Sequence, residues 1–455
     1  MNIVIHRGIN QIGGCITEIT TQSSHIFIDM GDNLPGSGTT KSLKEKIQMV
    51  ENLFAESKRE HEGVFYTHSH SDHVGMLNCV PDHITQYMGQ GCSDILQIKN
   101  DLLLKRNKIM QEALQKRNIN YSYLREYKDL QEEELMFQEI GLKLKQVVVW
   151  EQPKPKTAPH SITVGDIKVT PYFVSHSSFD SYMFHIEAGG KRILHTGDFR
   201  DHGYLGKGLM PTLKYYIRQV DVIITEGTML GRTQNAEHEK TIEAKMRAQM
   251  GIYKNVFVLT SSTDIEKLAA INAVAKSIDR PLFSCSSMMN RTLQYFTEYN
   301  KPYKNKLFDF KHYPYSVYSP NEKMLRLMHW KGFVMLVGVG QKDNIIKIMQ
   351  EGFSKEETLL IYSCWDGYYR IPEQVEVNPN YKEIRKLFSN VVDIHTSGHA
   401  NKETIEQVIR TLNPKDAIIG IHKNVDTSLL TLDLPDNLNA KIVPDSQQID
   451  WIIIK

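Results

Sequence analysis

The order of hydrophobic and polar positions divides the chain into strand-like and helix-like stretches. Short apolar runs separated by turn residues predict a β-meander over residues 1–31. Polar positions over residues 37–60 indicate a helix, and residues 93–142 repeat apolar positions at helical spacing, with Ser93 placed to cap the start. The strand pattern returns from Ile162, so strand signals flank the helical stretch on both sides.

Strand and helix signals alternate later in the chain. Val256–Leu259 has the composition of a buried strand, and Thr263 with Glu266 forms a capping-box pattern at the start of a helix. A further strand signal follows over Gly332–Val337. Alternation of this kind indicates an inserted α/β domain.

Length and composition restrict the class of protein. The chain has 455 residues, which predicts two domains or one domain with a large insertion. Its content of hydrophobic (41%) and charged (24%) residues is ordinary for a globular protein with a substantial core. No apolar run is as long as a membrane span, and the N-terminus lacks the basic-then-apolar order of a signal peptide. We therefore expect a cytoplasmic protein with no membrane partner.

Cysteine usage and overall charge do not point to a particular cofactor or partner. The five cysteines are scattered and form no C-x-x-C pair, which argues against a disulfide framework or a cysteine-ligated metal. We expect them to be reduced and structural. The net charge of +1 does not indicate a nucleic-acid binder, so any basic surface must be local.

One such local segment lies at residues 281–332. It contains eight Lys or Arg against three acidic residues, an excess of five positive charges. The aromatic residues interleaved with them are Tyr295, Phe296, Tyr299, Tyr303, Phe308, Phe310, Tyr313, Tyr315 and Tyr318. Basic groups that follow a phosphate backbone beside aromatic faces are typical of single-strand binding. The alternative is that many of these aromatic residues belong to the core.

The densest group of potential metal ligands follows a strand signal in the first half of the chain. The apolar run Val64–Tyr66 leads directly into His68, His70, Asp72 and His73. A loop that leaves a rigid strand can aim several side chains at one point, and three imidazoles with one carboxylate can divide between two adjacent ions. The alternative is a polar, His-rich surface loop.

Two further candidates follow later strand signals. His176 comes two residues after the strand signal Val169–Val174, and Asp198 follows the strand signal Arg192–His195. Each alone is equally typical of a core or turn residue. The pattern His-x-His-x-Asp-His, however, resembles the signature of the metallo-β-lactamase superfamily. The sequences around these two residues, Ser-His-Ser-Ser-Phe-Asp-Ser and His-Thr-Gly-Asp-Phe-Arg, resemble the RNase J branch of the β-CASP nucleases.

The resemblance implies a fold. Its class is α/β, an αββα metallo-β-lactamase sandwich with an inserted α/β β-CASP domain. Glu226, which ends a strand signal, matches the acidic residue at which β-CASP proteins leave the hydrolase fold. The implied segments are a first part of the core (1–228), the β-CASP insertion (229–390) and a completing part of the core (391–455).

The resemblance also implies a metal site with two Zn²⁺ per chain, although ligands of these types admit Mn²⁺ as well. One ion would be held by His68, His70 and His176, the other by Asp72, His73 and His422, with Asp198 between them. Asp29 would support the metal loop rather than bind metal, and a turn-forming Asp is the alternative.

Residues near the substrate follow from the second β-CASP motif, which Val391–Ala400 resembles. His399 would act near the leaving group, oriented or charged by Glu226, because a carboxylate favours a protonated imidazole. The implied catalytic residues are Asp72, Glu226 and His399. The implied phosphate-binding residues are Ser261, Ser262, His395 and Ser397, with helix capping by Thr263 and turn bonding by Ser397 as the alternative.

The preferred interpretation is a metal-dependent ribonuclease, a 5′-to-3′ exonuclease on 5′-monophosphorylated single-stranded RNA, with endonucleolytic cuts left open. Family members that act on DNA tend to have Val where this chain has His422, which favours RNA. The alternatives are a DNA nuclease, a small-molecule phosphoesterase, or a catalytically weak RNA-binding subunit. RNase J proteins usually have a C-terminal domain that helps them dimerise, but only a short stretch follows His422, so the oligomeric state stays open. Residues 93–142 look longer and more charged than in typical members, and we expect their charges to form a solvated helix face.

Overall fold

The structure is a computed structural model that describes most of the chain. The described residues are 1–37, 41–56, 58–117, 121–150, 159–232, 236–424, 429–435, 438–444 and 451–454. They form two compact units. Unit 1 comprises Met1–Asp201, Gly206–Gln234 and His399–Lys455, and unit 2 comprises His202–Leu205 and Asn235–Gly398. Each unit has its own sheet structure and its own core.

In the described part of unit 1, two sheets of seven strands each lie face to face. In spatial order the first contains β20 (Ile452–Ile454), β1 (Asn2–Arg7), β2 (Ile16–Thr20), β3 (Ser24–Ile28), β4 (His61–Phe65), β5 (Thr85–Gly89) and β6 (Val148–Trp150). The second contains β19 (Lys441–Ile442), β18 (Ala417–Ile421), β11 (Val222–Glu226), β10 (Lys191–His195), β9 (Ser181–Ala188), β8 (Ile167–Val174) and β7 (Ile162–Val164).

Both faces of these sheets are buried, which explains why their strands read as continuous apolar runs. Ile26 of β3 and Ile224 of β11 belong to the core between the two sheets. Phe27, the next residue of β3, points to the opposite face and packs with Val50 of α1 (Leu43–Glu56). On the outer face of the second sheet, Ile223 and Ile418 share a core with Ile405 of α14 (Lys402–Leu412). Helices therefore cover both outer faces, and the predicted αββα sandwich is confirmed.

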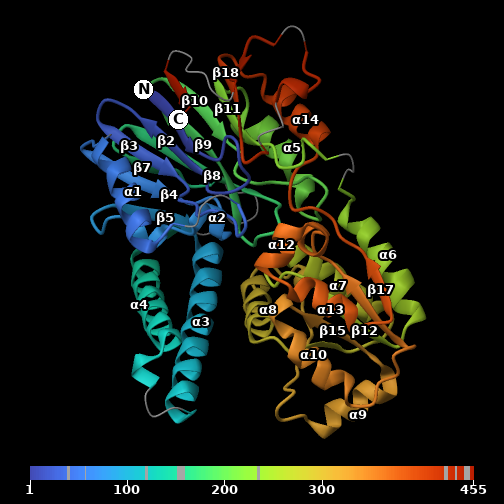
Figure 1. The fold of residues 1–455 in the computed structure, drawn as a ribbon. Helices are drawn as coiled ribbons and strands as arrows, with labels where there is room; N and C mark the ends of the chain where they lie inside the picture. Colours follow the sequence, from blue (N-terminus) through green and yellow to red (C-terminus); the bar gives the residue numbers. More distant parts are fainter. Residues whose placement is uncertain are drawn as a thin grey trace. The chain divides into compact units, whose positions relative to one another are not determined.

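A helical hairpin extends from unit 1. α3 (Gln90–Arg117) and α4 (Arg125–Gln146) lie side by side (Figure 1). The prediction that Ser93 caps this helix is wrong, because the helix begins at Gln90 and Ser93 is buried within it. The Asp180 carboxylate instead accepts a hydrogen bond from the Cys92 N–H at 3.2 Å. This cap comes from a residue far away in the sequence, so no local pattern could reveal it.

Unit 2 is built around one parallel sheet, which has six strands among the described residues. Their order is β14 (Tyr313–Pro314), β13 (Leu282–Ser284), β15 (Phe333–Val337), β12 (Asn255–Leu259), β16 (Thr358–Tyr362) and β17 (Asn390–Asp393). The helices are α6 (Glu239–Ile252), α7 (Ile265–Ser277), α8 (Ser287–Asn300), α9 (Glu322–Lys331), α10 (Lys342–Met349), α11 (Gly367–Arg370), α12 (Pro372–Val377) and α13 (Asn380–Lys386). The expected inserted α/β domain is confirmed.

The start of α7 differs from the prediction. The N-cap is Asp264, whose side chain accepts a hydrogen bond from the Lys267 N–H, so the capping box of Thr263 and Glu266 is wrong. Glu266 is buried and accepts a hydrogen bond from the Leu205 N–H at 2.8 Å. The Glu266 carboxylate therefore bonds the backbone of Leu205, an earlier segment of unit 2, and does not cap the helix.

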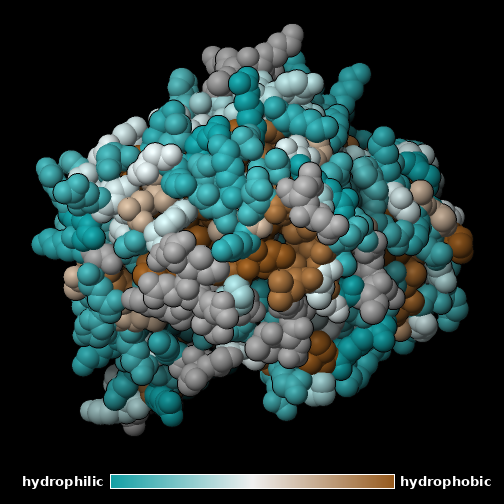
Figure 2. All heavy atoms as spheres, turned by 90° about the horizontal axis from the view of Figure 1, so that it is seen from above, coloured by the Kyte–Doolittle hydropathy of each residue, from teal (hydrophilic) through white to brown (hydrophobic). Residues whose placement is uncertain are grey.

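The aromatic residues of segment 281–332 divide between core and surface. Phe296, Phe308, Phe310 and Tyr315 are buried, so part of this set belongs to the core of unit 2. Tyr303, Tyr313 and Tyr318 are exposed. Hydrophilic residues make up most of the face shown in Figure 2, and hydrophobic residues gather in separate patches on it. In the part of the chain that the structure describes, no helix is long and apolar enough to span a membrane.

Candidate metal centre

The His-rich loop connects β4 to the short helix α2 (Ser71–Val74), and the backbone holds it in place. The Asp72 carbonyl accepts a hydrogen bond from the Cys15 N–H at 3.0 Å, and the His73 carbonyl accepts one from the Met30 N–H at 2.9 Å. Both donors belong to the chain around the neighbouring strands β2 and β3. These two bonds fix the end of the loop that contains Asp72 and His73 to the sheet.

His68, His70 and His176 bring three ring nitrogens together. Nδ1 of His70 lies 3.1 Å from Nε2 of His68 and 3.2 Å from Nε2 of His176. Burial lowers the pKa of His68 well below its ordinary value, and it lowers the pKa of His70 to about 4. These imidazoles are therefore neutral at pH 7, which is the form that binds a metal ion. The three residues form one of the groups that can hold a cation.

Asp198 lies at the centre of the cluster. Its Oδ2 atom is 3.8 Å from Nε2 of both His68 and His176, 3.3 Å from Nε2 of His73 and 3.7 Å from Nε2 of His422. Burial raises the pKa of this carboxyl group, but the neighbouring histidines His422, His73 and His399 outweigh burial and leave the pKa well below its usual range. Asp198 is therefore a buried carboxylate anion surrounded by imidazoles.

Asp72, His73 and His422 gather on the other side of Asp198. Oδ2 of Asp72 lies 3.9 Å from Nε2 of His73 and 3.8 Å from Nε2 of His422. Nε2 of His73 is buried and makes no hydrogen bond with the described residues. Burial lowers the pKa of His73, but the surrounding carboxylates outweigh burial and raise it well above its ordinary value. Carboxylates that favour a proton here also favour a metal cation, and His73 belongs to two of the groups that could hold one.

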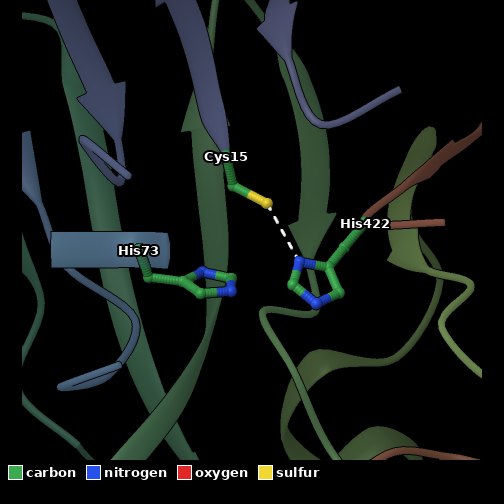
Figure 3. Close-up of side chains that lie close together, drawn as sticks. All are labelled: Cys15, His73 and His422. Carbon is green, nitrogen blue, oxygen red and sulfur yellow. Dashed lines mark hydrogen bonds between the residues drawn. The ribbon is translucent and has the colours of Figure 1, made fainter. Parts of the chain in front are cut away.

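Cys15 is a member of the cluster that sequence reasoning missed. Its side chain points toward His73 and His422 (Figure 3), and Sγ lies 3.2 Å from Nδ1 of His422. Cys15, His73 and His422 form a group that can hold a metal ion. Burial raises the pKa of the Cys15 thiol well above its ordinary value, so the thiol is neutral at pH 7. The expectation of a purely structural cysteine is therefore too narrow.

Asp29 supports the loop from behind. Its carboxylate accepts a hydrogen bond from the Thr67 N–H at 2.8 Å, and its Oδ2 lies 2.7 Å from Nδ1 of His73. A carboxylate that accepts the Nδ1 proton orients the ring, so that Nε2 is the atom available to a metal ion. Asp29 also has a left-handed backbone (φ 63°), which an Asp tolerates better than most residues. These contacts confirm the supporting role, and no turn is assigned at Asp29.

His399 and Glu226 form a pair at the edge of the cluster. Nδ1 of His399 lies 2.8 Å from Oε2 of Glu226 and 3.7 Å from Oδ2 of Asp198. Oε1 of Glu226 accepts a hydrogen bond from the Phe199 N–H at 2.9 Å, which fixes the buried carboxylate at the end of β11. Burial lowers the pKa of His399, but the charges of Glu226 and Asp198 outweigh burial and leave it above the ordinary value. His399 is therefore suited to hold a proton.

The four predicted phosphate-binding residues belong to unit 2. Ser261 and Ser262 follow β12, whereas His395 and Ser397 follow β17. Both strands pair in parallel with β16, which lies between them. The two loops therefore leave the same edge of the sheet, about 10 Å apart, the width of two strand spacings. Ser261 Oγ accepts a hydrogen bond from the Thr263 N–H, and the Ser397 carbonyl lies 2.8 Å from Nε2 of His202.

Comparison with known proteins agrees with this geometry. The chain is distantly similar to Ribonuclease J. The Ribonuclease J proteins of Helicobacter pylori strains 26695 and J99 are 21% identical to it over 90% of the chain. The chain spans about half the length (54%) of these curated relatives. No family model matches the chain.

The fold also has a relative among solved structures. A protein of unknown function from Enterococcus faecalis V583 superposes with a TM-score of 0.67 at 17% identity, covering 98% of both chains. This likeness concerns the fold alone. The buried His and Asp cluster is typical of dimetal hydrolases with the metallo-β-lactamase fold, and together with the distant similarity to Ribonuclease J it indicates a metal-dependent hydrolase.

Proposed function

We propose that the protein is a metal-dependent ribonuclease that hydrolyses the phosphodiester bonds of single-stranded RNA. Its preferred action is 5′-to-3′ exonuclease activity on 5′-monophosphorylated RNA. One observation supports this most strongly: a single Asp198 oxygen lies 3.3 to 3.8 Å from the Nε2 atoms of four histidines, with the His399 and Glu226 pair beside it. The distant similarity to Ribonuclease J points to RNA as the substrate.

Two Zn²⁺ ions are the proposed cofactors, with Mn²⁺ as an alternative that the same donor atoms accept. His68, His70 and His176 would hold one ion. Asp72, His73 and His422 would hold the other, and Asp198 would be shared. When bound, such a pair of ions polarises the phosphate and supplies a nucleophile at neutral pH. The buried Nε2 of His73, which lies near the carboxylates of Asp198 and Asp72 without a hydrogen bond among the described residues, supports this fit.

His399 is the proposed general acid. Water adds to the phosphorus atom and releases one proton to solvent, the bond from phosphorus to the leaving oxygen breaks, and the proton of His399 moves to that oxygen. His399 then regains a proton from solvent. Glu226 keeps His399 protonated through its contact with Nδ1, so Nε2 can face the substrate. In this proposal, the pair of His399 and Glu226 protonates the leaving oxygen.

The serine and histidine loops of unit 2 are the proposed site of the terminal phosphate. Ser261, Ser262, His395 and Ser397 offer hydroxyl and imidazole donors at one edge of a parallel sheet. Backbone N–H groups before a helix, as at the start of α7, also favour an anion. A 5′-phosphate held there would set the point from which an exonuclease starts.

The decisive experiment uses a single-stranded oligonucleotide labelled at its 3′ end, as RNA and as DNA, with a 5′-phosphate or a 5′-hydroxyl. We expect stepwise shortening of the 5′-phosphorylated RNA with Zn²⁺ or Mn²⁺, loss of activity with a chelator, and no activity of Asp72→Ala. Internal cuts that ignore the 5′ group would remove the phosphate site from the proposal. Failure to cleave any strand would overturn the nuclease.

Asp29→Asn tests the support of His73. Asn tolerates the left-handed backbone and can still accept the hydrogen bond from the Thr67 N–H, but its amide group cannot accept the Nδ1 proton of His73. We expect metal affinity to fall about 10- to 100-fold, the usual effect of losing such a partner. Competition with a chromophoric chelator measures this affinity. Asp166→Asn is the control, because this carboxylate bonds Thr21 and Ser23 instead. Unchanged affinity of Asp29→Asn would contradict the role.

A further inference from the structure

One face of α3 is exclusively basic. At 3.6 residues per turn, five exposed cations fall within an arc of about 120°. They are Lys99, Lys105, Arg106, Lys116 and Arg117. Lys99 has exposed surface, but burial lowers the pKa of its ammonium group, so the other four are the better solvated cations. The acidic residues of the helix, Asp94, Asp101 and Glu112, lie together outside that arc. We call the five cations and the apolar residues between them the basic face of α3.

The five cations are not neutralised within the described part of the chain. None of them forms an ion pair or a side-chain hydrogen bond with a described residue, whereas Lys108, on another side of α3, lies 3.7 Å from Glu134 of α4. The two helices also differ in charge. α3 has six basic and three acidic residues, and α4 has four basic and six acidic residues. Positive charge is therefore concentrated on one helix and on one face of it.

Apolar side chains lie in the middle of the basic face. They are Ile98, Leu102, Ile109 and Ala113. The sequence predicts this stripe as a packed face of the helix, but Ile109 is 56% exposed and the other three are only partly buried. A basic arc around a partly exposed apolar stripe is the composition of a binding surface rather than of a merely solvated helix face.

α4 contacts a different side of α3, where asparagine side chains of α3 bond the backbone of α4, and Leu96 and Leu144 share a core cluster near the sheet. The Asn107 side chain donates a hydrogen bond to the Leu130 carbonyl at 2.9 Å, and the Asn100 side chain donates one to the Phe137 carbonyl at 2.9 Å. The two asparagines lie about 80° and about 100° from the edge of the basic face around the helix axis. The contact between the helices is thus satisfied without the apolar stripe, and the hairpin leaves the basic face uncovered by α4.

We propose that the basic face of α3 binds the sugar-phosphate backbone of the RNA substrate at a distance from the metal centre. This inference rests on the proposed function. Lys99 and Lys116 are about 26 Å apart along the axis at 1.5 Å per residue, long enough to follow several nucleotides. Lysine and arginine neutralise phosphates without regard to base sequence, and the apolar stripe offers a surface for bases between them.

The position of the helix in unit 1 supports this role. α3 follows β5 directly, β5 pairs with β4, and β4 leads into the His-rich loop. The Asp180 carboxylate fixes the first turn of α3 through the Cys92 N–H. The basic face therefore belongs to the same unit as the metal cluster, and its helix begins at a strand next to β4.

The test is the triple variant Lys105→Glu, Arg106→Glu and Lys116→Glu. The matched control is Arg125→Glu, Lys128→Glu and Lys145→Glu, which makes the same change of charge at exposed positions of α4. Binding of fluorescent 5′-phosphorylated RNA of 5 and 30 nucleotides is measured by anisotropy at several KCl concentrations, in a His399→Ala background that slows cleavage. Turnover of both RNAs is measured with His399 intact.

We expect the α3 variant to bind the long RNA about tenfold or more weakly, and the slope of log affinity against log salt to fall by about two, for three lost phosphate contacts on a single strand. Binding and turnover of the short RNA stay unchanged, and the α4 control resembles the parent protein. Equal losses in both variants, or long-RNA binding unchanged in the α3 variant, would overturn the basic face as an RNA site. If the parent protein neither binds nor cleaves either RNA, the proposed function itself fails.

Discussion

Asp198→Asn is expected to reduce RNA hydrolysis by about 1000-fold or more and to lower the bound metal below two ions per chain. Metal and charge effects of this kind are worth several kcal/mol, and each 1.36 kcal/mol is a factor of ten in rate. The substitution keeps the size of the side chain but removes its negative charge. The neutral amide would lie at the point where the Nε2 atoms of His73 and His422 approach to 3.3 and 3.7 Å.

Metal analysis of the purified variant shows whether the loss of activity comes with a loss of bound metal. We expect both the metal content and the turnover to fall, because Oδ2 of Asp198 lies within 3.8 Å of Nε2 atoms from both groups of imidazoles. Asp416→Asn is the control, since that carboxylate pairs with Lys191 instead. A variant of Asp198 that keeps two tightly bound ions and normal turnover would refute the shared position of this residue.

The parts of the site that the sequence predicts are those whose members are close together in the chain. His68, His70, Asp72 and His73 stand within six residues after an apolar run, so one strand and one loop bring them together. Cys15 could not be predicted in this way. Its partner His422 is 407 residues away, and no spacing rule connects a thiol after two glycines with an imidazole after a distant strand.

The same limit applies to helix ends and faces. The capping patterns at Ser93 and Glu266 are local. In the structure, Asp180 accepts a hydrogen bond from the first turn of α3, and Leu205 donates one to Glu266. Both residues come from distant segments that the fold brings near. The apolar stripe of α3 is a second case. Periodicity correctly predicts that Ile98, Leu102 and Ile109 share a face, but it cannot say whether that face is covered. Asn100 and Asn107, on another side of α3, bond the backbone of α4. Sheet strands buried on both faces, such as β3, are free of this ambiguity.

His399→Ala is expected to lower turnover by about 100- to 10,000-fold while both metal ions remain bound, because a positioned general acid contributes an effect of this size. Glu226→Gln is the sharper variant. Gln can still accept the hydrogen bond from the Phe199 N–H, but it has no charge to stabilise a protonated His399. Burial alone lowers the pKa of His399, and the carboxylates of Glu226 and Asp198 raise it above its ordinary value, so loss of the Glu226 charge lowers it.

The direction of the pH effect follows from the proton that His399 must hold. A general acid works only when protonated, so kcat/KM falls as the pH rises through the pKa of His399. In Glu226→Gln this alkaline limb should move to lower pH, with the acid limb less affected. Profiles of kcat/KM from pH 5 to 10, with metal content measured at each end, test this. His185→Gln is a control because that histidine lies within β9. An unmoved limb in Glu226→Gln, or normal turnover of metal-loaded His399→Ala, would remove the pair from the chemistry and leave the leaving oxygen to be protonated by another group.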